Sequence, residues 1–526
     1  MALQGESGLA SDQVALASLG YKQEFRRDFR GYELFALAFS LISVVPSVAS
    51  VLVYALPNGG PVAMVWGWAA SSFFLIFVAM AMAELGSAMP TSGGLYYWTH
   101  RFSSKRYNNL LSWLVGYTNS VAYISGIAGL DWGCAVQIMA AVSIGTDFVP
   151  TVHQIFGVFC AILLCHGLIA SLPTSVLARM QTPYFVVNLL LCFALIIGIP
   201  AATPSELKNK ASFAFGDFTN LYGWPNGFAF ILSFLAPLWT VGGFDASVHI
   251  SEEARNAKVA VPWAVVSATV VGCLLGWVLN VVLAFNMGPD VVAVLENPIG
   301  QPMATILFNS FGKNGTLAIW CFIILPQFMA GISILTVASR QNFAFARDGA
   351  FPFSRYLYRM NRHTRTPVNS VWASAFSASL LGLLSFAGPA AIGAVFTLSV
   401  VAQYVAYSIP IAARFLGGRE FTPGPFNLGV FSLPVAVVAV SWMSFMAVVL
   451  LFPTTPETTP ETTPETMNYS VVVLGGVQFL ALVYYFFPKY GGVHWFEGPV
   501  TTVDKDDADK YGAERDRISE SDEKHL

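Results

Sequence analysis

Three ionisable residues lie inside long apolar stretches of the chain, and they are Asp131, His166 and Asp245. A charged side chain at the centre of a bilayer costs at least about 2.5 kcal/mol, so such residues usually mark a substrate or ion pathway or pair with another polar group. For Asp131 and Asp245 two interpretations stay open, a hydrogen bond between helices and a direct role in binding a substrate or a proton. For His166 we expect a core imidazole bonded to a neighbouring helix.

Two of the apolar stretches also carry helix-breaking residues near their middle. The sequence SVVPS occupies residues 43–47 of the first stretch, and WTVGGFD occupies residues 239–245 of the sixth. Breaks at matching depths of segments five spans apart are the pattern of a five-plus-five inverted repeat with discontinuous helices 1 and 6, in which unwound backbone and half-helix ends bind the substrate. The predicted substrate-binding residues are Ser43, Val44, Val45, Pro46, Ser47, Asp131, Trp239, Val241, Gly242, Gly243, Phe244 and Asp245.

A coupling ion would need ligands of its own close to these breaks. The candidates for a proton are Asp245 and His249, whose side chains exchange protons. The hydroxyls of Ser333 and Thr336, on the eighth apolar stretch, would suit sodium, with hydrogen bonds between helices as the alternative. We expect no metal site and no organic cofactor, because the intramembrane histidines are solitary and none of the six cysteines has a CxxC partner.

The composition excludes a soluble protein. Of the 526 residues 55% are hydrophobic and 11% charged, with a mean hydropathy of +0.61, whereas a soluble domain carries about 25% charged residues. A helix needs about 20 apolar residues to cross a bilayer. The sequence therefore predicts an all-α membrane protein of twelve transmembrane helices, over residues 31–56, 61–89, 110–144, 152–172, 182–202, 225–250, 262–287, 315–340, 367–387, 389–413, 431–452 and 469–487. Residues 290–311 predict a surface or re-entrant helix, since prolines and amides interrupt them.

The distribution of basic residues predicts the orientation in the membrane. All but three lysines and arginines fall on one side of the twelve helices, and the exceptions are Lys208, Lys210 and Lys313. The positive-inside rule then places both termini in the cytoplasm and two glycosylation sequons, at Asn314 and Asn468, outside. The expected parts are a cytoplasmic tail (1–30), two repeats (31–202 and 225–413), helices 11 and 12 (431–487) with an extracellular Thr/Pro/Glu linker (454–466), and a cytoplasmic tail (488–526).

Several longer motifs carry a family resemblance. They are AELGSAMPTSGGLYYW over residues 83–98, GFD over 243–245 with Glu252 and Glu253, FARDG over 345–349 after Ser339, Arg340 and Gln341, and YGGVHWFEGP over 490–499. With these motifs the chain resembles the amino acid-polyamine-organocation superfamily, and within it the fungal GABA, choline and amino-acid permeases. The resemblance covers about residues 20–503 and implies a LeuT-like fold, with spans one to five and six to ten as the inverted repeats.

The resemblance also implies a function, a multi-pass permease that uses the proton gradient, rather than sodium, to import its substrate by alternating access. The segment GPVAMVWGW over residues 60–68 favours the GABA-permease branch. The chain departs from the amino-acid permeases of the wider superfamily, which usually have a glycine-rich run in the first span, because its residues 43–47 contain no glycine. This makes an α-amino acid less favoured than GABA as the substrate. Choline or polyamine transport is the alternative within the family, and a non-transporting nutrient sensor is the alternative of another class.

The remaining expectations concern partners, location and gating. The chain is predicted not to be an enzyme, to lie in the plasma membrane or else the vacuolar membrane, and to contact lipid and a small substrate but no nucleic acid. Its oligomeric state is left open. Acidic residues at the cytoplasmic helix ends would face the basic loop 340–365 and form ion pairs that break during transport, or they would be static topological charge. The gate candidates are Glu84, Glu252, Glu253, Arg340 and Arg347.

Overall fold

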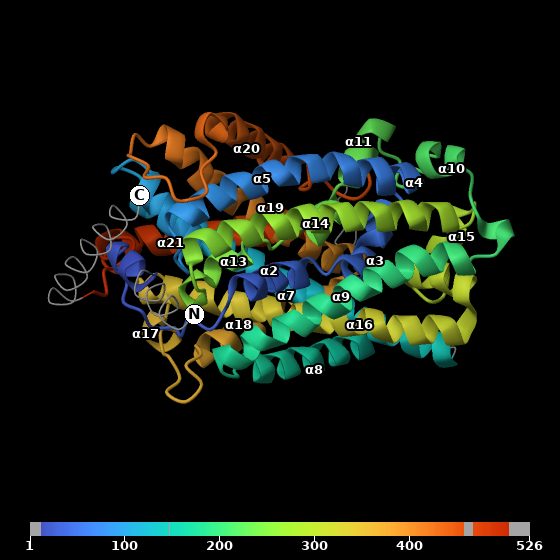
Figure 1. Cartoon of the computed structure of the whole chain (residues 1–526), viewed down its shortest axis with the longest axis horizontal. Coiled ribbons are helices and arrows are strands. Elements are labelled where there is room, and N and C mark those ends of the chain that lie inside the picture. Colours follow the sequence, from blue (N-terminus) through green and yellow to red (C-terminus); the bar gives the residue numbers. More distant parts are fainter. Residues whose placement is uncertain (1–11, 147, 457–466, 504–526) are drawn as a thin grey trace, which may run out of the picture.

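The computed structural model describes residues 12–146, 148–456 and 467–503. These residues form helices and loops with two isolated β-bridges, Phe29–Ala254 and Asn58–Asn220. The long helices run side by side along the longest axis of the molecule (Figure 1). Most of the predicted linker and the outer parts of both predicted tails, residues 457–466, 1–11 and 504–526, lie outside the described residues.

Eleven helical segments are long and apolar enough to cross a membrane. The first consists of α2 (Gly31–Ile42) and α3 (Val44–Ala55), and the second of α4 (Gly60–Val62), a π-helical turn (Ala63–Gly67) and α5 (Trp68–Ala88). The others are α7 (Asn108–Thr146), α8 (Val152–Ala170), α9 (Thr174–Ala202), α14 (Ala257–Asn286), α16 (Pro302–Arg347), α18 (Val368–Gly382) with the turn Leu383–Ala387, α19 (Pro389–Leu416), α20 (Ser432–Val449) and α21 (Tyr469–Phe486).

The predicted sixth span is present but broken into short helices. They are α11 (Asn226–Leu232), α12 (Leu235–Thr240) and α13 (Ala246–His249). Counting this segment with the eleven long ones gives the twelve spans that the sequence predicts. The all-helical membrane fold and the discontinuous first and sixth spans are therefore confirmed, whereas the inverted repeat stays a prediction.

The stretch 290–311 is only partly as predicted. It forms α15 (Val291–Leu295) and the first turns of α16, and Gly312, with φ 67° and ψ −179°, kinks α16 between those turns and the eighth span. Met303, Ile306 and Leu307 are buried, so this part of α16 packs into the protein instead of lying on its surface.

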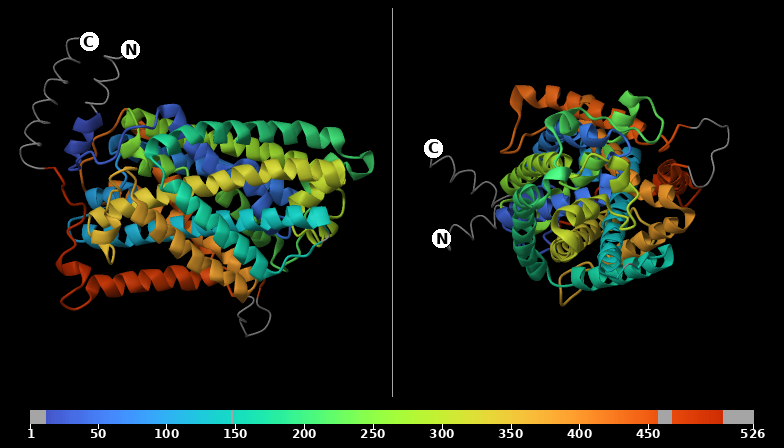
Figure 2. Two further views of the ribbon diagram at one scale, coloured as in Figure 1. Left: turned by 90° about the horizontal axis from the view of Figure 1, so that it is seen from below. Right: turned by 90° about the vertical axis from the view of Figure 1, so that its right-hand side faces the viewer.

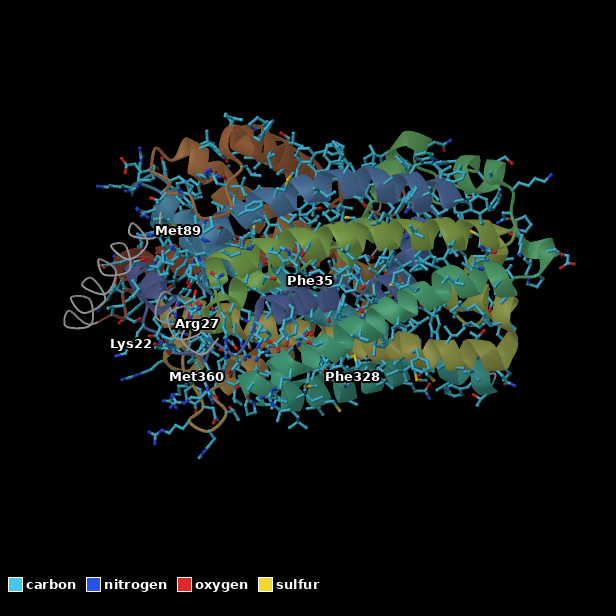
Figure 3. The ribbon with its side chains drawn as sticks, in the orientation of Figure 1. Lys22, Arg27, Phe35, Met89, Phe328 and Met360 are labelled. Atoms are coloured by element: carbon cyan, nitrogen blue, oxygen red, sulfur yellow. The ribbon has the colours of Figure 1, made fainter. Side chains whose placement is uncertain are left out.

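The two ends of the helix bundle differ. One end, here called the terminal face, carries both terminal segments, which bond to each other: the Lys22 N–H donates to Thr502 Oγ1 (2.8 Å), and the Thr502 N–H to the Gly20 carbonyl (2.8 Å). Figure 3 shows Lys22 and Arg27 at this end. The opposite end, the far face, carries α10 (Ala211–Gly216) and α15 (Figure 1). The last helix, α21, lies on the outside of the bundle (Figure 2).

Close helix packing depends on glycines that leave room for large side chains. A Cβ on Gly276 of α14 would lie 2.0 Å from Cζ2 of Trp68 on α5. Trp68 is buried, and its indole N–H donates to the Cys273 carbonyl (2.9 Å), so the ring has no room to retreat. Small residues are favoured at such contacts because, between membrane helices, van der Waals packing replaces the hydrophobic effect as the main attraction.

We predict that Gly276→Ala destabilises the protein by about 1–3 kcal/mol, the usual cost of overpacking a filled site. The matched control is Gly157→Ala on α8, where a Cβ meets nothing within 4 Å and alanine favours the helix. The measurement is the melting temperature of detergent-solubilised protein. Equal melting temperatures for the two variants would contradict this account of the α5–α14 contact.

Candidate functional site

The first span breaks at Ser43, whose φ of 40° and ψ of 61° place it in the left-handed region. A non-glycine residue there costs of order 1–3 kcal/mol, so the surroundings must hold it. Pro46 lacks the N–H that would bond the Ile42 carbonyl, and the Ser47 hydroxyl donates to that carbonyl instead (2.9 Å). The Ser43 hydroxyl donates to Oδ1 of Asn188 on α9 (3.1 Å). Side chains thus satisfy the backbone at this break.

The sixth span breaks over residues 241–245, between α12 and α13. Gly243 has a φ of 71°, which a side chain would strain. A Cβ on Gly242 would lie 3.1 Å from the Trp239 carbonyl oxygen and 3.3 Å from Oε1 of Gln403. The two glycines therefore allow both the unwound backbone and the close approach of α19.

A cavity of about 30 Å³ lies between the two breaks, enough for roughly two water molecules. Four of the predicted substrate-binding residues line it, namely Ser47, Trp239, Gly242 and Gly243. The lining residues that sequence reasoning missed are Leu41, Gly126, Leu130, Ile334, Ser399, Val400 and Gln403. Within the described part of the chain, none of the lining side chains is ionisable.

An aromatic layer separates this cavity from the far face. The Trp239 ring lies 4.6 Å from that of Phe396, and the Tyr54 ring lies 5.7 Å from Phe396. Beyond this layer is a larger cavity of about 480 Å³, bordered by Tyr54 and Asn58 of the first span and by the start of α19. A row of three rings thus runs from Trp239 at the central cavity through Phe396 to Tyr54 at the larger one.

A buried polar cluster adjoins the central cavity on the side of the terminal face. Oδ2 of Asp245 lies 3.4 Å from Nε2 of His249, and the hydroxyls of Tyr123 and Tyr407 face the same carboxylate. Neither Asp245 oxygen accepts a well-formed hydrogen bond from the described residues. A buried carboxylate in this situation is costly in its charged form.

The partners of His249 indicate where its proton lies. Its Nδ1 is 2.8 Å from the Ser92 carbonyl oxygen, which only accepts, so Nδ1 carries a hydrogen. Its Nε2 is 3.1 Å from Nδ2 of Asn119, an amide whose orientation is an assignment. Asp245, Asn119 and the Ser92 carbonyl are thereby joined through His249 in one buried cluster.

The remaining predicted substrate-binding residues do not line the cavity. Val44, Val45 and Pro46 are buried at the start of α3, Val241 is buried in the second break, and the Phe244 ring packs 5.8 Å from Tyr407.

Asp131 lies outside the cavity as well, where it bonds His166 of α8 through Nδ1 (3.0 and 3.1 Å). Gly331 of α16 makes room for this pair, since a Cβ there would lie 2.3 Å from both side chains. The prediction that His166 bonds a neighbouring helix is confirmed.

The two hydroxyls considered for sodium form hydrogen bonds within the protein. Ser333 donates to Oε1 of Gln181 on α9 (3.0 Å) and to the Met329 carbonyl (3.1 Å). Thr336 donates to the Ile332 carbonyl (2.8 Å). For Ser333 the structure contains the interhelical hydrogen bond that was the alternative interpretation.

Two buried ion pairs close the terminal side. Glu252 binds Arg347 through two contacts of 3.1 Å and also accepts from Thr91 (3.1 Å) and the Ser92 N–H (3.0 Å). Burial alone would raise the pKa of Glu252, but Arg347 and these hydrogen bonds bring it below its ordinary value. Glu253 binds Arg340 at 2.7 Å.

Glu84 corrects one expectation. It was expected to face the basic loop 340–365, but it pairs with Arg414 of α19 instead (2.5 Å) and accepts from the Ser432 hydroxyl (2.7 Å). The reason is that α5 packs against α20 and α19.

Asp348 joins three segments next to these ion pairs. Its carboxylate accepts from Tyr21 of the N-terminal segment (3.1 Å), from Tyr96 (2.7 Å) of α6 (Gly94–Phe102) and from the Val500 N–H of the C-terminal segment (3.0 Å). Burial raises the pKa of Asp348 to about 6, although Arg347 and these hydrogen bonds lower it. Arg347 also stacks on the Tyr21 ring, 3.7 Å from its centre. Both terminal segments are thereby attached to the terminal face next to the ion pairs.

These features define a class of protein: a multi-pass membrane protein whose central cavity lies between two broken helices. Comparison with known proteins places it further. The family model described as amino acid permease matches residues 32–477. The chain therefore belongs to the amino acid permease family, whose members are transporters rather than enzymes.

Individual relatives match almost the whole chain. An uncharacterized amino-acid permease of Schizosaccharomyces pombe is 37% identical over 95% of this chain and 90% of its own length. The GABA-specific permease of Saccharomyces cerevisiae is 36% identical over 94% of this chain and 87% of its own. Amino-acid permease 2 of Neurospora crassa is 33% identical over 94% and 90%, respectively.

The raised pKa of Asp348 predicts a pH dependence of stability. Between its ordinary pKa of 3.8 and about 6, the folded protein binds more protons than the unfolded chain, so the contribution of Asp348 to stability falls as pH rises through this window. The expected total is about 3 kcal/mol. Asp348→Asn should lack this component, so the wild-type melting temperature should fall relative to that of the variant between pH 4 and 6.

The control is Glu420→Gln, an exposed carboxylate on the same face. Its melting curve should follow the wild type at every pH. Parallel curves for wild type and Asp348→Asn across this range would contradict the assignment of the raised pKa to Asp348.

Proposed function

We propose that this protein is a secondary active transporter that imports GABA, or a related amino acid or small amine, by proton symport with alternating access. The observation that carries the proposal is the Asp245–His249 cluster, a buried carboxylate without a well-formed hydrogen bond beside an imidazole, next to a cavity between two broken helices. The similarity to a GABA-specific permease supports the choice of substrate class.

The proposed orientation places the terminal face in the cytoplasm of a plasma-membrane protein, following the distribution of basic residues. The inverted repeats would be residues 31–202 and 225–413, with the spans in 431–487 at the periphery. On this assignment the 480 Å³ cavity faces outward, and the ion pairs of Glu252 and Glu253 face inward.

The asymmetry between the two closures supports alternating access. Removing one partner from a buried ion pair costs about 3–5 kcal/mol, so opening the terminal side is costly unless another interaction compensates. Rearranging the rings of Trp239 and Phe396 breaks no ion pair and no hydrogen bond between them. Substrate would therefore enter past the aromatic layer, and the loaded site would have to favour the inward-open state by its differential binding energy.

Protonation of Asp245 provides such an energy. A proton on this carboxylate removes a buried charge and lets the acid donate a hydrogen bond to Nε2 of His249. His249 also holds the Ser92 carbonyl, and the Ser92 N–H holds Glu252, so the proton site and the inner ion pair share one short segment. Proton uptake and the stability of the inner closure are thereby linked.

We predict that Asp245→Asn abolishes proton-driven accumulation, because the amide matches the carboxyl in size but does not titrate. The measurement is uptake of radiolabelled GABA, with and without a protonophore, by cells that lack their own permeases. Wild-type uptake should fall with the protonophore, and the residual uptake by Asp245→Asn should be insensitive to it.

The matched control is Asp131→Asn, a second buried carboxylate on a membrane helix, which keeps an oxygen for His166. It should retain uptake within about threefold and stay sensitive to the protonophore. Proton-sensitive accumulation by Asp245→Asn would remove this residue from coupling. Absence of uptake of GABA, choline, putrescine and α-amino acids by wild type, at normal surface expression, would contradict the transporter proposal in favour of a sensor.

A further inference from the structure

Gln403 of α19 lines the central cavity with a side chain that the protein itself leaves unused. The residue is 6% exposed, and no described residue forms a hydrogen bond with its amide. The Oε1 atoms of Gln137 and Gln327 are enclosed by protein without a partner, whereas the amide of Gln403 is accessible from the cavity. The open side of this amide is the cavity.

Other buried glutamines of the membrane helices show the contrast. Gln137 donates to the Pro46 carbonyl (3.0 Å), Gln327 to the Leu130 carbonyl (2.9 Å) and Gln181 to the Leu177 carbonyl (3.2 Å). Gln341 donates to the Gly116 carbonyl (3.5 Å). Each of these four holds the backbone of a helix. Gln403 holds none, although it too is buried in the bundle.

Gln403 lies in the same cavity lining as residues of both broken helices. Its Oε1 lies against Gly242 of the second break, where a Cβ would be 3.3 Å away. The cavity also touches Ser47 of the first break and Ser399, one turn earlier on α19. The hydroxyls of these two serines donate to the Ile42 and Ala122 carbonyls (2.9 and 3.0 Å). Their hydrogens are therefore committed, and the Gln403 NH₂ group is an uncommitted donor.

The chemistry of the cavity points to a carboxylate as the partner of this donor. Among the described lining residues none is a lysine or arginine, so a carboxylate in the cavity would depend on neutral donors. Two of the lining residues carry a donor that forms no hydrogen bond with a described residue, the Gln403 amide and the indole N–H of Trp239. A hydrogen bond to a charged group is about twice as strong as one between neutral groups, and it would satisfy the buried amide as well.

We propose that Gln403 is a specificity-determining residue whose side-chain amide donates a hydrogen bond to the carboxylate of the transported zwitterion. This inference rests on the proposed function and adds to it the group that separates amino acids from amines without a carboxylate. A cationic amine gains nothing from the donor, whereas an amino acid loses a charge-assisted bond when it is removed.

Two substitutions separate the loss of the hydrogen-bond donor from the introduction of a negative charge. Gln403→Met keeps the length of the side chain but has no donor, and Gln403→Glu replaces the donor by a negative charge. The ligands form a matched pair, GABA and 4-aminobutanamide, which differ in the carboxylate alone. The measurement is the concentration of each ligand needed to halve uptake of a labelled substrate that the variant transports, at equal surface expression.

For wild type, GABA should compete better than 4-aminobutanamide. In Gln403→Met the GABA value should rise at least tenfold while that of 4-aminobutanamide changes less than threefold. In Gln403→Glu the preference should reverse, because the new carboxylate repels GABA and attracts the amine. Ser408→Ala, on the same helix and bonded within it, is the control and should behave as wild type.

The outcomes also distinguish this inference from the proposed function. If wild type transports GABA and Gln403→Met binds it unchanged, the role of Gln403 is wrong and the transporter proposal stands. If wild type takes up choline or putrescine but no carboxylate-bearing solute, both the GABA assignment and the carboxylate role are wrong. Should Gln403→Glu fail to reach the surface, Gln403→Met alone decides.

Discussion

The structure depends on one constraint, which is that backbone polar groups at the depth of a bilayer must find partners inside the protein. The first span breaks at Ser43 and Pro46, and the Ile42 carbonyl, which loses its helical partner because Pro46 has no N–H, accepts from the Ser47 hydroxyl. Gln137 of α7 also donates to the Pro46 carbonyl, which attaches the start of α3 to α7. Asn188 of α9 holds the Ser43 hydroxyl. The break is therefore a fixed feature held by neighbouring helices.

The same constraint accounts for the distribution of charged groups around the site. At the second break the glycines expose backbone, and the side chains nearby are neutral except for Asp245, which lies just outside the cavity. Charges are concentrated toward the terminal face, where Glu252, Glu253 and Asp348 each have named partners. Toward the far face the closure is made of aromatic rings. A cavity without ionisable lining residues, the Asp245–His249 pair and the two ion pairs thus follow one another along the bundle toward the terminal face.

The sequence predicted those parts of the arrangement where helix-breaking residues interrupt an apolar span. Proline and paired glycines mark the two breaks, and they led directly to Ser47, Trp239, Gly242 and Gly243. Residues on uninterrupted helices gave no such signal. Ser399, Val400 and Gln403 belong to an apolar span that reads as ordinary core, and only a lone amide in that span hints at a role.

The sequence also did not predict which side chains on distant helices pair with each other. Asp131 and Glu84 could be recognised as unusual residues, but whether they face the cavity depends on which helices pack beside them. In the structure Asp131 pairs with His166, and Glu84 pairs with Arg414. Likewise, Tyr96 and the Val500 N–H both donate to the carboxylate of Asp348. These three residues lie far apart in the chain, and no local pattern indicates that they meet.

The central claim is that substrate binds in the cavity between the two breaks. Val400 lines that cavity and is buried, so a reagent reaches a cysteine in its place only when the cavity opens to one side, and substrate in the cavity would shield it. The measurement is the rate at which a small, charged sulfhydryl reagent modifies Val400→Cys in membranes, with the wild-type protein, which has six cysteines of its own, as background. The account predicts that saturating GABA slows modification at least fivefold. An unchanged rate in a variant that still transports GABA would contradict it.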